Sequence, residues 1–191
     1  MTLDGETLMY SDWYGGGLQG VKSKPLDFST KNKLVWAPHY YTPAVYPQPY
    51  YFASKTGQGF VELSDDALRG RIQGTMNAMF GYLASETGPA MLLGEFGGLY
   101  STDAHPKKTT KRCTDFTIEV ITKPGWAGGF VWSLNPESKY DYNPADKQGT
   151  FVEGVLERDW LSANKDYLAA LAAMNGMANL RPFPCFPMRA A

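Results

Sequence analysis

The residue of this sequence that most directly suggests chemistry is a single carboxylate, Glu95, in an otherwise apolar run at residues 91–96. The run has the length and composition of a buried strand, and the two glycines that follow it permit a sharp exit. An ionised carboxylate at the end of a buried strand costs free energy unless hydrogen bonds or charged partners hold it, and such arrangements are frequent at functional sites. Glu95 is therefore a candidate functional residue, and the alternative is a structural glutamate that caps the following turn.

A histidine and a tyrosine form a second candidate group, two residues apart at the end of another predicted strand, 34–41. Side chains alternate along a strand, so His39 and Tyr41 share one face. Pro38 cannot donate a hydrogen bond to a neighbouring strand, which predicts that the regular ladder ends close to it. An isolated histidine is commonly a structural residue, but its pairing with Tyr41 favours a functional interpretation.

Aromatic residues make up 14% of the chain, with 12 Tyr and 5 Trp, which is more amphipathic ring surface than a core needs. Such rings bind polar ligands with flat faces, and sugars are ligands of this kind. Two tryptophans are suitably placed, because Trp132 lies in a predicted strand at 129–135 and Trp13 precedes three glycines in a loop. We therefore expect both rings to present exposed faces near Glu95.

The overall composition excludes several classes of protein. With 191 residues, 43% of them hydrophobic, a net charge of -1 and a pI of about 6.1, the chain reads as one soluble domain without the charge pattern of a nucleic-acid-binding or membrane-surface protein. No apolar run approaches the ~20 residues of a membrane span, and acidic residues among the first twenty argue against a secretion signal within the chain. The sequence predicts neither a metal site nor a cofactor, and it leaves open a single bridge between Cys113 and Cys185.

Periodicity predicts three helices that alternate with the three strands. The first begins at an N-cap, Ser64, and carries an apolar stripe; the second covers about 106–122 with four cations on a solvated face; the third closes the chain over 159–176. This alternation predicts parallel strands covered by helices, with reactive side chains at the C-terminal strand ends. We expect the 91–96 strand to lie between the other two.

Two long connections and a tail complete the chain. Residues 42–62 are rich in Tyr and Pro, and loops of this length in compact domains are commonly functional. The connection after the third strand contains several acids at 137–146, but they lack the spacing of a calcium-binding loop, so a solvated loop is the better interpretation. The Pro-rich end at 181–191 is predicted to be an extended tail.

Several segments together resemble the C-terminal half of the catalytic domain of glycoside hydrolase family 5, in particular its endoglucanase-like members. These segments are residues 10–20, 34–46, 92–98, 131–138 and 159–160. The resemblance implies that residues 1–180 are the C-terminal part of a (β/α)8 TIM barrel, about strands six to eight with their helices. It also implies retaining hydrolysis of β-linked glucans or mannans by an extracellular enzyme without a cofactor.

The resemblance assigns roles to individual residues. Glu95 matches the catalytic nucleophile of the seventh strand, and His39 and Tyr41 match the His-x-Tyr of the sixth. Trp132 matches the sugar-platform tryptophan of the eighth. The side-chain chemistry agrees, because Tyr41 can hold Glu95 ionised and oriented through a hydrogen bond, and Trp132 can stack under a sugar ring.

The sequence departs from the family pattern around the rest of the site. Trp13 and Asn135 are further candidate substrate-binding residues, although Leu134 and the loop after it differ from the Trp and Gly-Asp pattern of some members. A retaining glycosidase also needs a second carboxyl group, its acid/base, roughly 5 Å from the nucleophile. The family supplies this acid from an Asn-Glu-Pro motif on the fourth strand, and no such motif occurs in the sequence.

Three interpretations remain open. The chain is a piece of a glycosidase that lacks the proton donor, a non-catalytic carbohydrate-binding remnant that keeps the aromatic platform, or a different α/β enzyme that uses Glu95 alone. In the first two the partner is a β-glucan or a related polysaccharide, and neither nucleic acid nor a membrane is expected. Open strand edges also predict self-association or aggregation.

Overall fold

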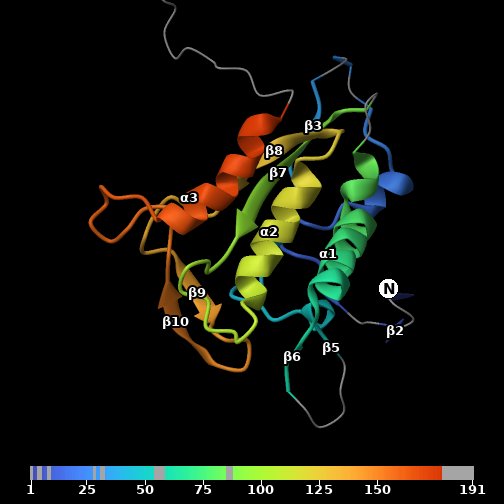
Figure 1. The fold of residues 1–191 in the computed structure, drawn as a ribbon. Helices are drawn as coiled ribbons and strands as arrows, with labels where there is room; N and C mark the ends of the chain where they lie inside the picture. Colours follow the sequence, from blue (N-terminus) through green and yellow to red (C-terminus); the bar gives the residue numbers. More distant parts are fainter. Residues whose placement is uncertain are drawn as a thin grey trace, which may run out of the picture.

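The structure, a computed structural model, describes residues 2–3, 6–7, 10–27, 29–30, 33–53, 59–84 and 88–177. Its centre is a parallel sheet in which β7 (Ala90–Gly97) is the middle strand (Figure 1). β3 (Val35–Trp36) and β4 (His39–Tyr41) pair with one edge of β7, and β8 (Trp126–Val131) pairs with the other. The predicted arrangement of parallel strands with the Glu95 strand in the middle is therefore confirmed.

The structure corrects the bounds of two predicted strands. The strand expected at 34–41 is split into β3 and β4 at Pro38, which has no N–H to donate to the ladder. Pro38 still contributes its carbonyl oxygen, which accepts a hydrogen bond from the backbone N–H of Gly94 (2.7 Å). The strand expected at 129–135 begins earlier, at Trp126, and ends at Val131.

The first helix follows the prediction closely. In α1 (Asp65–Met79), Ser64 is the N-cap, and its Oγ accepts a hydrogen bond from the backbone N–H of Ala67 (3.4 Å). The helix ends earlier than its apolar stripe, which continues into the 3-10 helix η3 (Gly81–Leu83). The following residues of the stripe are buried in the core: Leu68, Ile72, Met76, Met79 and Phe80.

The second helix, α2 (Thr109–Ile121), begins later than predicted, and its cations do not simply form a solvated face. The ammonium of Lys108 donates to the carbonyl oxygen of Asp103 (2.6 Å), and Nη1 of Arg112 binds Oδ1 of Asp65 (2.8 Å). These contacts tie the start of α2 to the loop after β7 and to the start of α1. Figure 1 shows the helices side by side in front of the sheet.

The third helix, α3 (Lys165–Leu171), is shorter than the one predicted over 159–176, and it continues only as the 3-10 helix η4 (Ala172–Gly176). Asp159 prevents an earlier start, because its Oδ1 accepts from two following backbone N–H groups and closes a turn. The helix begins instead after Asn164, whose side-chain oxygen accepts from the backbone N–H three residues later (3.3 Å).

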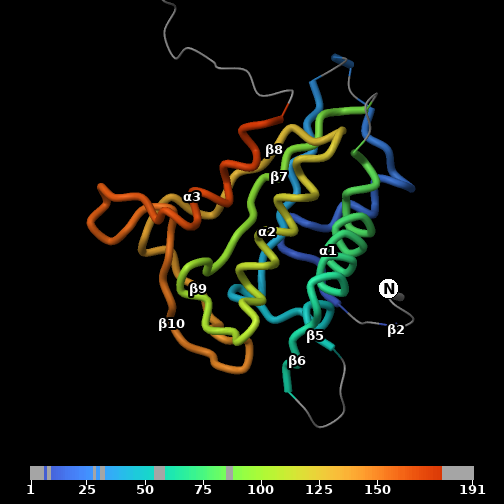
Figure 2. Tube along the Cα trace, viewed as in Figure 1, coloured from blue at the N-terminus to red at the C-terminus, as the bar shows by residue number. Residues whose placement is uncertain are grey.

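Short elements occupy the long connections. The region of acids at 137–146 is not merely a solvated loop, because it forms part of an antiparallel hairpin, which Figure 2 shows beyond the C-terminal end of β7. The 42–62 loop also contains regular structure. That loop contains η2 (Pro49–Tyr51) and the pair β5 (Phe52–Ala53) with β6 (Val61–Glu62), and the hairpin consists of β9 (Lys139–Tyr142) with β10 (Gln148–Val152). The N-terminal part of the chain contains β1 (Thr2–Leu3) with β2 (Glu6–Thr7), and η1 (Gln19–Lys22).

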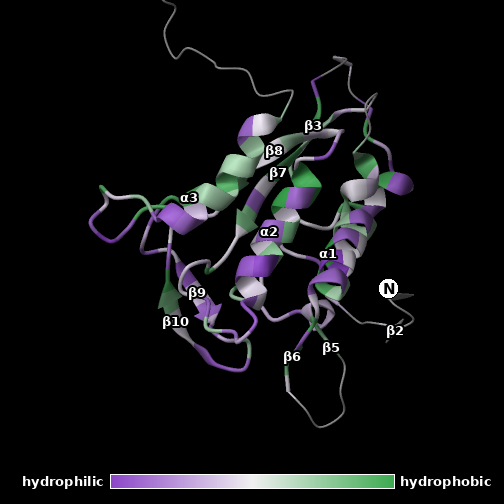
Figure 3. Ribbon diagram, in the orientation of Figure 1, coloured by the Kyte–Doolittle hydropathy of each residue, from purple (hydrophilic) through white to green (hydrophobic). Residues whose placement is uncertain are grey.

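In the described part of the chain, neither outer edge of the central sheet pairs with a further strand. Among the described residues, β7 is the only strand that pairs with β8, and it is also the only one that pairs with β3 and β4. α3 is mostly hydrophobic beyond its first turn, whereas α1 carries many hydrophilic residues (Figure 3). Leu168 of α3 and Phe130 of β8 are largely exposed. Among the described residues, the β8 edge therefore presents apolar side chains and pairs with no further strand.

Cys113 lies on α2, is buried and forms no disulfide with any described residue, and burial raises the pKa of its thiol well above the ordinary value. Its candidate bridge partner, Cys185, lies outside the described residues, as does the predicted tail at 181–191. No helix in the described part of the chain has both the length and the apolar character that crossing a membrane requires.

Candidate active site

Two neighbouring strands bring three of the predicted residues together at the C-terminal end of the sheet. The register pairs His39 of β4 with Glu95 of β7. The hydroxyl of Tyr41 donates a hydrogen bond to Oε2 of Glu95, and Nδ1 of His39 lies 3.4 Å from the same oxygen. The Glu95 side chain is 32% exposed, so a ligand can reach the carboxylate that these residues hold.

The close approach of β4 and β7 depends on Gly94. A Cβ atom at this position would lie 2.6 Å from the carbonyl oxygen of Ala37 and 3.2 Å from Cδ2 of His39. A side chain would push the two strands apart just before the residues that carry the site. Glycine at position 94 therefore permits the contact between His39 and Glu95.

Tyr41 is fixed as a hydrogen-bond donor. Burial first, and then the hydrogen bond and the charge of Glu95, raise the pKa of the Tyr41 hydroxyl well above its ordinary value. The hydroxyl therefore keeps its proton at neutral pH. The hydroxyl of Tyr51 donates to the carbonyl oxygen of Tyr41, which fixes the backbone of the same residue.

The glycine-rich loop packs behind these residues and corrects the prediction for Trp13. The backbone N–H of His39 donates to the carbonyl oxygen of Gly15 (3.3 Å), which has a φ of +76°. Trp13 is only 6% exposed, and its ring lies edge-on to Tyr40 and Tyr41, at centroid distances of 6.4 and 5.9 Å. The expectation of an exposed face on Trp13 is wrong, because this ring supports Tyr41 from the core.

The exposed ring of the loop belongs to the next residue, Tyr14, which is 94% exposed and was not among the predicted site residues. The backbone N–H of Gly16 donates to the carbonyl oxygen of Trp13 (2.7 Å) and closes a tight turn. Within this turn Trp13 packs inward and Tyr14 outward. The available signal was the aromatic pair before the glycines, which does not reveal which ring is buried.

Trp132 lies beside the end of β7, as expected. Its backbone N–H donates to the carbonyl oxygen of Phe96 (2.7 Å), its carbonyl oxygen accepts from the hydroxyl of Tyr140 (2.9 Å), and its side chain is 45% exposed. Asn135 has a different place, because its Oδ1 accepts from the backbone N–H of Glu137 (2.7 Å) within a turn. No contact in the described part of the chain joins Asn135 to the carboxylate on β7.

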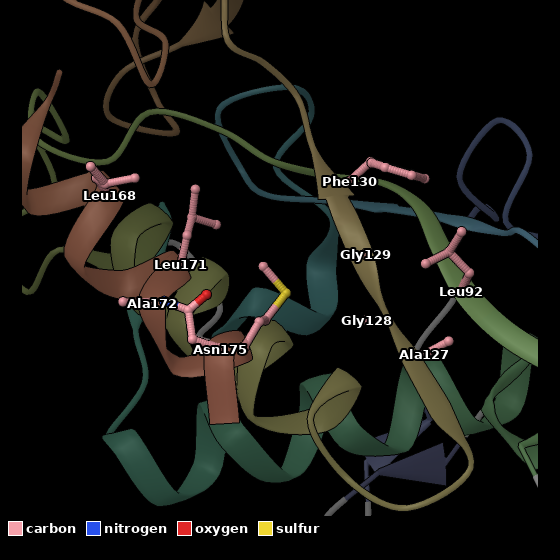
Figure 4. Close-up of a pocket in the computed structure, with 10 residues that line it drawn as sticks. Leu92, Ala127, Gly128, Gly129, Phe130, Leu168, Leu171, Ala172 and Asn175 are labelled. Carbon is pink, nitrogen blue, oxygen red and sulfur yellow. The ribbon is translucent and has the colours of Figure 1, made fainter. Parts of the chain in front are cut away.

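A pocket of about 580 Å³ lies between β8 and α3 (Figure 4). Its walls are mainly apolar, and the lining residues include Leu92, Phe130, Leu171 and Met174. None of the residues predicted to form the site lines this pocket. It belongs to the open edge of the sheet and is separate from the Glu95 site.

Relatives of this chain are endoglucanases. The chain is 31% identical over 166 residues to the major extracellular endoglucanase of Xanthomonas campestris pv. campestris. The aligned residues cover 87% of this chain and 28% of that protein. It is 30% identical to endoglucanase G of Acetivibrio thermocellus, over 75% of this chain and 26% of that protein. The chain thus spans little more than a quarter of the length of these relatives. No protein-family model matches it.

Solved structures give the same result. An endocellulase of the archaeon Pyrococcus horikoshii, also solved with cellotetraose, has a TM-score of 0.63 and 29% identity, over 85% of this chain and 37% of that chain. The catalytic domain of the Xanthomonas campestris endoglucanase has a TM-score of 0.62 and 28% identity, over 85% of this chain and 39% of that chain.

This α/β chain therefore resembles the cellulase-type glycosyl hydrolases in sequence and fold. Within that class its homologues are endoglucanases, and the resemblance to the endoglucanase-like members of glycoside hydrolase family 5 is confirmed.

Proposed function

We propose that this chain is the part of a retaining glycoside hydrolase that carries the catalytic nucleophile, Glu95, and that its substrates are β-linked glucans. The carrying observation is the Glu95 carboxylate at the C-terminal end of the middle strand, contacted at Oε2 by Tyr41 and His39. The exposed side chain of Trp132 on the adjoining segment supports sugar binding beside it. The relatives, named endoglucanase and endocellulase, support the substrate class.

In this mechanism Oε1 of Glu95 attacks the anomeric carbon, and the glycosidic bond breaks with its electron pair on the leaving oxygen. Tyr41 and His39 engage Oε2 and so orient the carboxylate for attack. Water then hydrolyses the covalent glycosyl-enzyme and restores the free carboxylate. Trp132 stacks against the apolar face of the sugar and fixes the position of the anomeric carbon.

The leaving oxygen also needs a proton, which a second carboxyl group roughly 5 Å from the nucleophile supplies in retaining enzymes. Among the described residues no second carboxylate contacts Glu95, and the sequence contains no Asn-Glu-Pro motif. We infer that the acid/base is not carried by this chain. The isolated chain should therefore hydrolyse unactivated β-glucan very slowly.

We also infer that β3 with β4, β7 and β8 are strands six, seven and eight of a (β/α)8 barrel, within a unit of residues 1–180. The parallel order and the collection of site residues at one end of the sheet support this assignment. In a closed barrel each outer edge of this sheet would pair with a further strand, so we expect the isolated chain to associate with another polypeptide or another copy. The relative named a major extracellular endoglucanase supports an extracellular location and a β-glucan as ligand. We expect neither nucleic acid nor a membrane as partner because the net charge of the chain is only -1.

The test is covalent trapping with an activated aryl 2-deoxy-2-fluoro-β-cellobioside, whose leaving group departs with little protonation. We expect the purified chain to gain the mass of one glycosyl group on Glu95. The Glu95→Gln variant should react at least about 10³-fold more slowly, because the amide is not a nucleophile. Glu157→Gln, which changes an exposed carboxylate elsewhere, is the matched control and should react like the wild type.

Two outcomes would contradict parts of this proposal. Labelling that persists in Glu95→Gln would remove the nucleophile assignment. Rapid hydrolysis of unactivated β-glucan by the isolated wild-type chain would show that an acid lies within these residues.

A second candidate function is carbohydrate binding without turnover, which the exposed Trp132 favours in a chain without an identified acid. This function predicts that cellotetraose binds and that Trp132→Ala weakens the binding, while Glu95 is never labelled. Calorimetry and the trapping experiment together distinguish the two functions.

A further inference from the structure

We propose that Glu153, which follows β10, is a positioning residue that couples the loop after Glu95 to the segment that carries Trp132. This inference rests on the proposed function of those two residues. Glu153 is only 6% exposed, although an ionised carboxylate is costly to bury. Its partners explain how the charge is accommodated and what the residue holds in place.

The side chain of Glu153 gathers the loop that leaves the nucleophile strand. Oε2 accepts from the backbone N–H groups of Tyr100 (2.9 Å) and Thr102 (3.1 Å) and from the hydroxyl of Thr102 (2.5 Å). Oε1 accepts from the backbone N–H of Ser101 (2.7 Å). Three consecutive backbone N–H groups thus converge on one carboxylate, and such charge-assisted hydrogen bonds are stronger than neutral ones.

The backbone around Glu153 holds the segment that follows Trp132. The N–H of Glu153 donates to the carbonyl oxygen of Ser138 (3.2 Å), and the N–H of Val155 donates to the carbonyl oxygen of Ser133 (2.9 Å). Ser133 is the residue next to Trp132. Glu153 therefore binds the loop after β7 through its side chain. Its backbone belongs to a segment that is hydrogen-bonded to the residues after β8.

Asn164 adds a third connection, from the start of α3. Its Nδ2 donates to Oε1 of Glu153 (2.8 Å), and its Oδ1 accepts from the hydroxyl of Ser101 (2.7 Å). The backbone N–H of Asn164 also donates to the carbonyl oxygen of Val155 (2.8 Å). The loop after β7, the segment after β8 and the start of α3 consequently share one buried hydrogen-bond network centred on Glu153.

This network is placed to set the geometry between the nucleophile and the sugar platform. Tyr100, where the network begins, is five positions after Glu95, and Ser133, which accepts from the paired segment, directly follows Trp132. A displacement of about 1 Å between a nucleophile and a bound substrate can cost about 10²-fold in rate. Loss of the Glu153 carboxylate should therefore slow attack by Glu95 even in molecules that remain folded.

The experiment compares the full chain with its Glu153→Gln, Glu153→Asp and Glu157→Gln variants in the trapping reaction. The rate at saturating reagent and the half-saturation concentration are measured separately, well below each unfolding midpoint. We expect Glu153→Gln to lower the maximal labelling rate about 10- to 100-fold. Amide hydrogen exchange at residues 100–102 should become faster in the same variant. Glu153→Asp should have a higher labelling rate and slower amide exchange than Glu153→Gln, because it keeps the carboxylate. If Glu153→Gln does not fold, Glu153→Asp is compared with the wild type instead.

A maximal labelling rate that stays at the wild-type value while the unfolding midpoint falls would overturn the proposal, because Glu153 would then only stabilise the fold. A wild-type chain that is not labelled at all would contradict the proposed function instead. In that case the coupling is read from the indole N–H resonance of Trp132, assigned with Trp132→Phe. This resonance should shift in Glu153→Gln and stay in place in Glu157→Gln, and an unchanged resonance in both would overturn the coupling.

Discussion

The two sides of the middle strand β7 differ in how completely this chain supports them. On the β4 side, Tyr41 and His39 contact Glu95, and the buried Trp13 packs behind Tyr41. On the β8 side, Phe130 is 64% exposed, and no further strand among the described residues pairs with β8. The polar groups of the site are thus organised by contacts within the chain, while no further strand among the described residues covers the apolar edge beside them. Support of the nucleophile does not require the open edge to be closed.

The largest effect expected from this difference is on stability. Leu93 of β7 is fully buried, so Leu93→Ala should lower the free energy of unfolding by about 2–5 kcal/mol, through lost burial and a cavity. Phe130→Ala on β8 should change it by less than about 0.5 kcal/mol, because the side chain is already exposed. Urea unfolding of both variants measures the contrast.

The same pair of variants also tests the edge as an association surface. Phe130→Ala should weaken concentration-dependent association in sedimentation experiments, because it removes exposed apolar surface. Equal destabilisation by Leu93→Ala and Phe130→Ala would mean that the β8 edge is covered in solution, and the comparison between the two sides of β7 would fail.

The next effect concerns the supported side of the sheet. Tyr41→Phe removes the donor to Oε2 of Glu95 and keeps the ring, so trapping of Glu95 should slow about 10- to 100-fold, as expected for a hydrogen bond to a charged group. Tyr46→Phe, at an exposed tyrosine in the following loop, is the matched control. A wild-type trapping rate in Tyr41→Phe would show that this contact does not orient the nucleophile.

A third effect is a pH dependence in the loop after β7. Burial opposes ionisation of Asp103, but hydrogen bonds from the His105 side chain and from the backbone of Lys111 and His105 outweigh it and lower the Asp103 pKa. A pKa lowered in the folded state stabilises the fold above the unfolded pKa of about 3.9, and this contribution is lost as the pH falls through the folded value. Asp103→Asn should therefore cost about 1–3 kcal/mol at pH 7.

The cost of Asp103→Asn should shrink as the pH falls below about 4, where the wild type loses the same charge. Unfolding midpoints of both proteins between pH 7 and pH 2.5 measure this convergence. If the destabilisation by Asp103→Asn does not depend on pH, the charge of Asp103 does not contribute to stability, and the change in side-chain shape explains the loss.

Much of the sheet and of the site could be predicted because the signals are local. The apolar run around Glu95 and the helical stripe after Ser64 have the periodicity of their elements, and parallel strands bring their C-terminal ends together. The His-x-Tyr spacing placed His39 and Tyr41 on one face, and β4 pairs them with the end of β7. These features require no knowledge of distant contacts.

Other features depend on contacts that a sequence pattern does not contain. The burial of Trp13 is determined by packing against Tyr40 and Tyr41, so an aromatic residue beside glycines was wrongly expected to be exposed. The late start of α3 depends on the turn at Asp159. Glu153 gave no signal at all, because most of its partners are backbone groups about fifty residues earlier in the chain.

The buried thiol of Cys113 makes this chain a reporter of its own opening. A thiol reacts as the thiolate, and burial both raises the Cys113 pKa and shields the sulfur from reagents. Modification must therefore wait until α2 separates from the core. In a Cys185→Ser background, the rate at which a thiol reagent modifies Cys113 would report how often α2 separates from the sheet that carries Glu95.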